Sequence, residues 1–306
     1  MLLVSSGISA ITFSFPVMMM ARIILGFGVG GYWAVAIASS ARLVPKQKVA
    51  RAVAVISAGI STAMVISVPF ATFIGSHFNW RITFIASTIL AFFVFLLQFV
   101  FLPKLPTEKG LGVSDFFGIL RNRNMQIVLI SAVFSISGHF AAYTFITPFF
   151  QQVTVIGPTL LSILMLGNGI MGIVGNVLGG IAIGRNLHRT MVTTMALFTI
   201  ALMMVGLFGQ SLIAATTGLL IWALAFGIIP LGMQVWAQAS SPQAPEAAQA
   251  MITTVSQLSI SFGSLLGGII VDAINLTAIM WMGGGMSALS LVVVSFFGKR
   301  AATAET

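Results

Sequence analysis

The sequence of 306 residues predicts an all-α polytopic protein that crosses a membrane about ten times. Hydrophobic residues make up 58% of the chain and charged residues only 6%, and the mean hydropathy is +1.09. A soluble domain carries roughly a quarter charged residues, so this composition disfavours soluble enzymes, nucleic-acid-binding proteins and secreted scaffolds. The second observation is the set of stretches without any Asp, Glu, Lys or Arg, which are 1–21, 23–41, 52–80, 82–103, 124–184, 190–245, 247–271 and 273–298.

Each of these stretches provides about the 20 apolar residues that a transmembrane helix needs, and two of them are long enough for two helices. Turn signals supply the divisions: Pro16 separates the first two spans, 151–158 divides the first long stretch, and 209–211 divides the second. The predicted spans are 1–15, 17–41, 52–76, 82–102, 125–150, 158–183, 191–208, 212–236, 248–271 and 278–298. The first is short and has a signal peptide as its alternative, although the positively charged start of such a peptide is missing.

The basic residues gather in alternate loops. Twelve of them are Arg42, Lys46, Lys48, Arg51, Lys104, Lys109, Arg121, Arg123, Arg185, Arg189, Lys299 and Arg300, whereas the opposite set of loops holds only Arg81. Because short cytoplasmic loops are enriched in Lys and Arg, both termini are predicted to be cytoplasmic. The net charge of +9 is thus a topology signal and requires no nucleic-acid partner.

The segment 103–124 contains two Pro, three Gly and six charges, which is typical of a linker between helical bundles. It would separate a partial N-terminal bundle of four spans (1–102) from a C-terminal bundle of six (125–298), followed by a cytoplasmic tail (299–306). Transporters are often built from two related halves, so the front half is expected to lack two helices.

Four passages resemble motifs of the major facilitator superfamily. Arg22 to Ala34, which includes Gly26, Gly28, Gly30 and Gly31, resembles the Arg-and-glycine motif of the family's fourth helix, and Arg42 to Pro45 with Arg51 resembles the cytoplasmic loop after it. Gly59, Pro69 and Gly75 with Asn79 to Phe84 resemble the antiporter helix and the turn that follows. Gly179 to Arg189 resembles the loop between helices eight and nine.

The resemblance covers nearly the whole chain. It is to the branch of bacterial proton-coupled exporters that includes the arabinose and sugar efflux permeases and the purine ribonucleoside efflux pump. It implies the major facilitator fold, with the ten spans as family helices three to twelve. It also implies a monomer in a bacterial inner membrane that uses the proton gradient and no other cofactor. The first two family helices have no counterpart, so we expect either a fragment or mis-started reading frame, or a reduced protein.

An ionisable residue inside a bilayer is by default a functional candidate. Arg22 lies five residues into its span, where it either snorkels to the interface or modulates a proton-carrying acid. No carboxylate falls within any predicted span, so no residue is assigned as the proton carrier. The position of Arg22 inside a span and the resemblance to the family motifs give the candidates for coupling or gating: Arg22, Gly26, Gly30, Pro69, Arg81, Arg185 and Arg189.

Neutral polar and aromatic residues within the spans are the candidate solute contacts: Tyr32, Trp33, Ser61, His139, Tyr143, Asn168, Gln234, Trp236 and Gln257. Amides and aromatic faces suit a neutral, ring-containing polar solute, although hydrogen bonding between helices is the alternative for each. His139 is either a proton switch or ligand contact, or a buried neutral histidine with a partner on a neighbouring helix.

The sequence therefore predicts a secondary active transporter that works by alternating access. The resemblance implies export in exchange for protons, and the favoured solute is a purine nucleoside or a sugar-like molecule. Export of hydrophobic drugs is one alternative, and a truncated membrane fragment without transport activity is another. An enzyme is disfavoured because the spans hold no His/Glu metal pattern or catalytic dyad. The expected partners are a small-molecule solute and the lipid bilayer.

Overall fold

The computed structural model describes residues 1–43, 78–102 and 118–298, together with a few positions between 59 and 74. Side chains are not described at 30, 31, 33–43 and 246. Within the described ranges all regular secondary structure is helical. The chain divides into two compact units, 1–109 and 110–306, and the boundary falls inside the segment predicted as a linker. The predicted span 52–76 lies almost entirely outside the described residues.

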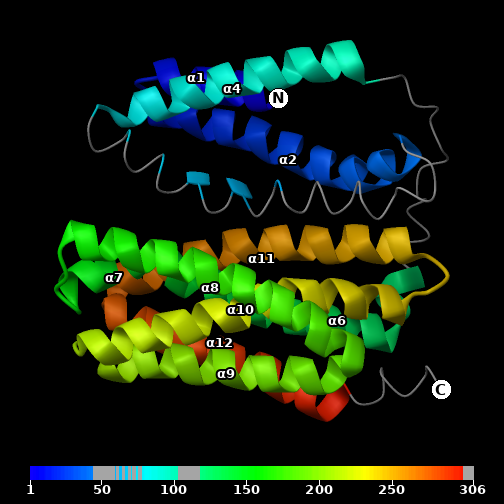
Figure 1. Cartoon of the computed structure of the whole chain (residues 1–306), viewed down its shortest axis with the longest axis vertical. Helices are drawn as coiled ribbons and strands as arrows, with labels where there is room; N and C mark the ends of the chain where they lie inside the picture. Colours follow the sequence, from blue (N-terminus) through cyan, green and yellow to red (C-terminus); the bar gives the residue numbers. More distant parts are fainter. Residues whose placement is uncertain are drawn as a thin grey trace. The chain divides into compact units, whose positions relative to one another are not determined.

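The first unit contains α1 (Leu2–Ile11), α2 (Phe15–Leu43) and α4 (Trp80–Phe101), with α1 packed against the other two. Figure 1 shows these helices in blue and cyan. Helix α1 has ten residues, so the predicted span 1–15 is wrong in length, because the helix already ends at Ile11. Pro16 is the second residue of α2, a position where its missing N–H has no intrahelical partner to lose.

The second unit contains seven helices among its described residues (Figure 1). Polar side chains that accept hydrogen bonds from the first turn fix the start of four of them, as expected for residues at an N-cap. These caps are Asn122, Asn186, Ser211 and Asn275. The helices are α6 (Arg123–Thr144), α7 (Ile146–Gln152), α8 (Pro158–Arg185), α9 (Leu187–Phe208), α10 (Leu212–Ser240), α11 (Pro245–Ala273) and α12 (Leu276–Phe297).

The predicted span 125–150 is not a single helix. It breaks at Phe145, whose backbone has φ −109° and ψ 15°, so that α6 ends at Thr144 and α7 begins at Ile146. Pro148 explains the break, because it has no N–H for the Thr144 carbonyl and its ring would clash with that carbonyl in a continuous helix. Sequence inspection missed this because the charge-free stretch continues through the proline.

Seven helices among the described residues are long and apolar enough to cross a membrane. They are α4, α6, α8, α9, α10, α12 and residues 247–273 of α11. The full number of crossings in the chain stays a prediction, since 44–77 is mostly outside the described part. The all-helical, multi-pass architecture agrees with the fold class predicted from the charge-free stretches.

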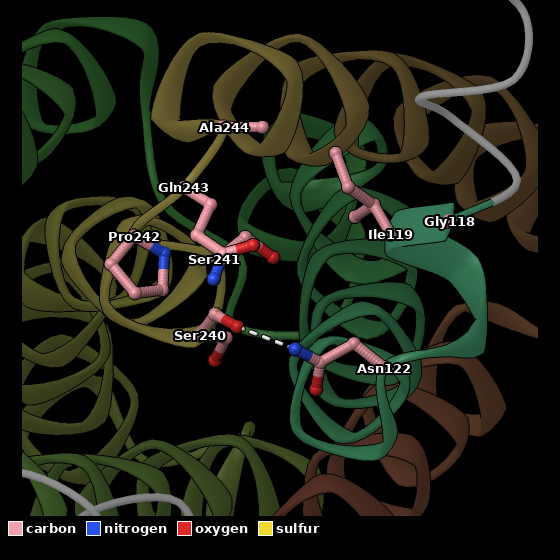
Figure 2. A pocket seen from close by; sticks show the side chains of 8 residues that line it. All are labelled: Gly118, Ile119, Asn122, Ser240, Ser241, Pro242, Gln243 and Ala244. Carbon is pink, nitrogen blue, oxygen red and sulfur yellow. Dashed lines mark hydrogen bonds between the residues drawn. The ribbon is translucent and has the colours of Figure 1, made fainter.

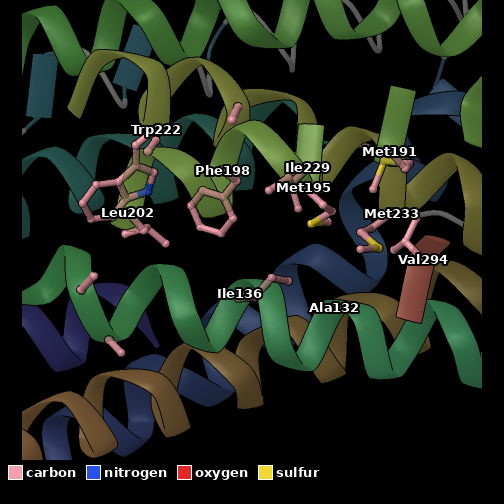
Figure 3. Packing of buried hydrophobic residues seen from close by; sticks show 14 of the residues in the cluster. Ala132, Ile136, Met191, Met195, Phe198, Leu202, Trp222, Ile229, Met233 and Val294 are labelled. Carbon is pink, nitrogen blue, oxygen red and sulfur yellow. The ribbon is translucent and has the colours of Figure 1, made fainter. Parts of the chain in front are cut away.

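Helix α6 lies at the centre of the second unit, in contact with α10, α11 and α12. Figure 3 shows buried side chains of α9 and α10, among them Phe198 and Trp222, in the layer between these helices and α6, which carries Ala132 and Ile136. Close approach depends on glycine: a Cβ placed on Gly283 of α12 would lie 2.8 Å from the carbonyl oxygen of Gly138 on α6. Small residues of this kind bring transmembrane helices into backbone contact.

Candidate functional site

His139 lies in the second half of α6 and is only 6% exposed. Its Nδ1 accepts a hydrogen bond of 2.9 Å from the indole Nε1–H of Trp222, on α10. An indole nitrogen can only donate, so Nδ1 carries a lone pair and no hydrogen in this arrangement. His139 is therefore a neutral imidazole with its hydrogen on Nε2.

Aromatic rings surround the imidazole. The Phe226 ring is stacked on it, with centroids 3.2 Å apart and planes 5° apart, and the Tyr143 ring lies nearly parallel to it at 5.1 Å. Phe198 of α9 is 6.1 Å away. We call His139, Tyr143, Phe198, Trp222 and Phe226 the aromatic cluster. Three helices contribute to it, so it ties α6, α9 and α10 together at mid-bundle.

The aromatic cluster reaches the surface of the second unit. Tyr143 and Phe226 are half-buried, as is the neighbouring Phe140, whose ring meets the imidazole edge-on at 4.8 Å. In this tautomer the Nε2–H of His139 has no hydrogen-bond partner within the described residues.

One other predicted contact, Asn168, lies on α8, the helix that packs most extensively against α10. Asn168 is half-buried. Asn176, two helical turns further along, donates from Nδ2 to the carbonyl oxygen of Gly227 at 3.3 Å, next to Phe226. One amide is thus engaged in helix packing beside the aromatic cluster, and the other lies at a half-buried position on the same helix.

The remaining predicted contacts of the second unit do not join the aromatic cluster. Gln234 and Gln257 are exposed. Trp236 is 4% exposed and belongs to the hydrophobic core. Its ring lies near Gly298 and His188, at the end of the bundle where α9 begins. The aromatic cluster and Trp236 are therefore separate features of α10.

In the first unit, two predicted cations rest on aromatic rings. The Arg22 guanidinium of α2 lies 4.7 Å from the Phe84 ring centroid. Arg81 lies over Phe13 at 4.4 Å and Trp80 at 4.3 Å, and its Nη2 donates to a backbone carbonyl after α1 at 3.3 Å. Its Nε is buried without a partner in the described part of the chain. Cation–π contacts replace carboxylate partners at both sites.

The other predicted positions give less structural information. A Cβ added to Gly26 would meet no atom within 4 Å, and Tyr32 is 54% exposed. Arg185 and Arg189 are exposed on either side of the Asn186 cap. Gly30 and Trp33 have no described side chain, and Ser61 and Pro69 lie outside the described residues.

One cavity opens at the end of the second unit where α6 begins and α10 passes into α11 (Figure 2). It has a volume of about 510 Å³. Asn122 and Ser240 face each other across it and are joined by a hydrogen bond of 2.6 Å from Nδ2 to the carbonyl oxygen. No predicted solute contact lines this cavity, and the described residues contain no group of His, Cys, Asp and Glu able to hold a metal ion.

Sequence reasoning missed the partners of His139. Trp222, Phe226 and Phe198 lie in apolar stretches where aromatic residues are ordinary packing material. The available signal was the tryptophan, because an indole N–H at mid-span requires an acceptor.

Comparison with known proteins places these features in a family. Residues 1–264 match the Major Facilitator Superfamily. The chain belongs to this superfamily. It is therefore a multi-pass membrane transporter rather than an enzyme, and transporters of this kind generally need no cofactor.

Two relatives and one structure illustrate the similarity. The purine ribonucleoside efflux pump NepI of Escherichia coli K12 is 28% identical over 282 residues, which cover 92% of this chain and 71% of the pump. The pump of the same name from Shigella dysenteriae is also 28% identical, over 92% of this chain and 72% of the relative. The crystal structure of the human organic anion transporter MFSD10 (TETRAN) aligns with a TM-score of 0.68 and 18% identity, covering 96% of this chain and 74% of that one. At that identity the structural match supports the fold alone.

Proposed function

We propose that this transporter exports a small, neutral, ring-containing solute of the purine nucleoside class, in exchange for protons and by alternating access. The observation that carries the proposal is the half-buried edge of the aromatic cluster. Tyr143 and Phe226 offer ring faces for stacking, and His139 offers one neutral N–H donor. A planar heterocycle with ring-nitrogen and carbonyl acceptors matches both features.

The direction of transport and the solute class draw support from the relatives, which are named as purine ribonucleoside efflux pumps. A sugar-like solute would use the same hydrogen-bond donor but would gain less from parallel ring faces. Asn168, Gln234 and Gln257 are proposed as further contacts on the second unit, and Tyr32, Trp33 and Ser61 on the first. Trp236 is buried in the core and is not proposed as a contact.

The proposal assigns coupling and gating to the cationic and glycine-rich positions. Arg22 is the proposed cation near the solute path, since its guanidinium lies on the Phe84 ring and has no carboxylate partner among the described residues. Arg81 would hold the turn that precedes α4. The other proposed positions are Gly26, Gly30, Pro69, Arg185 and Arg189. The protein is proposed to be a monomer in a bacterial inner membrane, as the family resemblance implies, and the loop charges support cytoplasmic termini.

Everted membrane vesicles test this proposal. In vesicles that contain the full chain and are energised by respiration, [³H]inosine should accumulate above the level of vesicles without the chain, and a protonophore should abolish the difference. Substitution of His139 by Ala should raise the KM for inosine. An exporter of hydrophobic drugs would instead accumulate ethidium and leave inosine outside, and that result would refute the proposed solute class.

A further inference from the structure

Trp222 holds the imidazole of His139 in one hydrogen-bonding state. Its side chain is 1% exposed, and its indole N–H donates to His139 Nδ1 at 2.9 Å. The Phe226 and Tyr143 rings lie nearly parallel to the imidazole plane, so they limit rotation of the ring. The imidazole is therefore restrained in orientation by stacking and in tautomer by one donor.

We propose that Trp222 is a positioning residue that makes His139 a hydrogen-bond donor only, so that the site selects solutes with an acceptor, such as an sp² ring nitrogen or a carbonyl oxygen. This inference rests on the proposed function, in which His139 contacts the solute. Trp222 itself acts through the imidazole and does not touch the solute.

The selectivity follows from the chemistry of imidazole. A neutral histidine without a partner can carry its hydrogen on either ring nitrogen, and Nε2 is then a donor in one tautomer and an acceptor in the other. The indole N–H disfavours a hydrogen on Nδ1, and it therefore disfavours the doubly protonated imidazolium as well. With Trp222 in place, Nε2 always presents N–H, and a solute that offers only a donor at this point leaves two donors facing each other.

Trp222→Phe removes the indole N–H and keeps an aromatic ring. His139→Gln places an amide donor near the position of Nε2, and an amide has no tautomer that a neighbour must fix. In the everted-vesicle assay, Trp222→Phe should raise the KM for inosine about threefold to tenfold, as expected for weakening one neutral hydrogen bond. The maximal rate should stay within about twofold of the unmodified chain, because the substitution acts on solute binding.

The double variant separates positioning from packing. In the His139→Gln background, Trp222→Phe should change the KM less than about twofold, because the amide does not depend on the indole. Trp236→Phe is the matched control, since it removes another buried indole of α10 that lies away from His139. An equal rise in KM from Trp222→Phe in both backgrounds would overturn the inference and leave Trp222 a packing residue.

A spectroscopic measurement keeps the inference testable if a variant does not transport. The chain has three histidines, so ¹⁵N-histidine labelling of the purified protein gives few side-chain signals, and the signal absent from His139→Gln identifies residue 139. Its two-bond ¹H–¹⁵N pattern should show hydrogen on Nε2 alone between about pH 6 and 8, a range that brackets the ordinary histidine value, and a mixture of states in Trp222→Phe. A mixture already present in the unmodified chain would overturn the inference. By contrast, a fixed Nε2–H state in a chain that never moves inosine would refute the proposed function alone.

Discussion

The contact between α6 and α12 predicts how the stability of the protein changes when a methyl group is added at Gly283. A Cβ on Gly283 would lie 2.8 Å from the carbonyl oxygen of Gly138 and 3.3 Å from the Cβ of Ala142. Both neighbours belong to α6, and the nearer one is backbone, so the helices must move apart to admit a methyl group. Overpacking of this kind costs about 1–3 kcal/mol, whereas replacing a helical glycine with alanine gains about 0.5–1 kcal/mol. The net expectation for Gly283→Ala is a loss of about 1–2 kcal/mol.

The same helix supplies the control. A Cβ on Gly285 would meet no atom within 4 Å, so Gly285→Ala should be neutral or slightly stabilising. Thermal unfolding in detergent, followed by intrinsic tryptophan fluorescence, should show a Tm about 2–8 °C lower for Gly283→Ala, at about 2–4 °C for each kcal/mol. Equal Tm values for the two variants would refute the reasoning that the α6–α12 contact depends on the missing side chain.

Three further predictions concern single side chains. Thr154→Val removes a buried hydroxyl that donates to the Gly209 carbonyl oxygen at 2.7 Å, and it should lower stability by about 1 kcal/mol in the same unfolding assay; an unchanged Tm would contradict this. Ser137→Ala removes the 3.0 Å hydrogen bond to the Ser259 carbonyl oxygen between α6 and α11, and hydrogen exchange of both helices should increase, whereas unchanged exchange would show that the hydroxyl is dispensable. Tyr143→Phe keeps the ring stacked on the imidazole and should leave the KM for inosine within about twofold, whereas Tyr143→Ala should raise it several-fold; equal KM values would exclude stacking as the cause.

Composition and charge placement were enough to predict a multi-pass helical protein, because an apolar stretch of about 20 residues without charges is long enough to cross a bilayer as a helix. They also came within a few residues of two helix starts, since the predicted spans begin at 125 and 191 and the helices α6 and α9 begin at Arg123 and Leu187. The break at Phe145 was not predicted, since it depends on how Pro148 affects a carbonyl four residues earlier. The absence of charged residues from a stretch does not reveal a helix break of this kind.

The candidate site was predictable in part. His139 stood out because a titratable residue in the middle of a span needs a partner. Its partner could not be identified, since Trp222 lies 83 positions away and only the packing of α10 against α6 brings the two together. The same limit explains Trp236, which resembles a solute contact in sequence but is enclosed by the core at another level of the bundle.

Photoaffinity labelling of the purified chain with 8-azidoadenosine, followed by peptide mapping, tests the central claim most directly. The account predicts adducts on α6 or α10 near Phe140, Tyr143 or Phe226, and an excess of inosine should prevent them. Labelling that inosine does not reduce, or that inosine reduces only at sites on other helices of the second unit, would contradict the claim that the aromatic cluster forms part of the solute site.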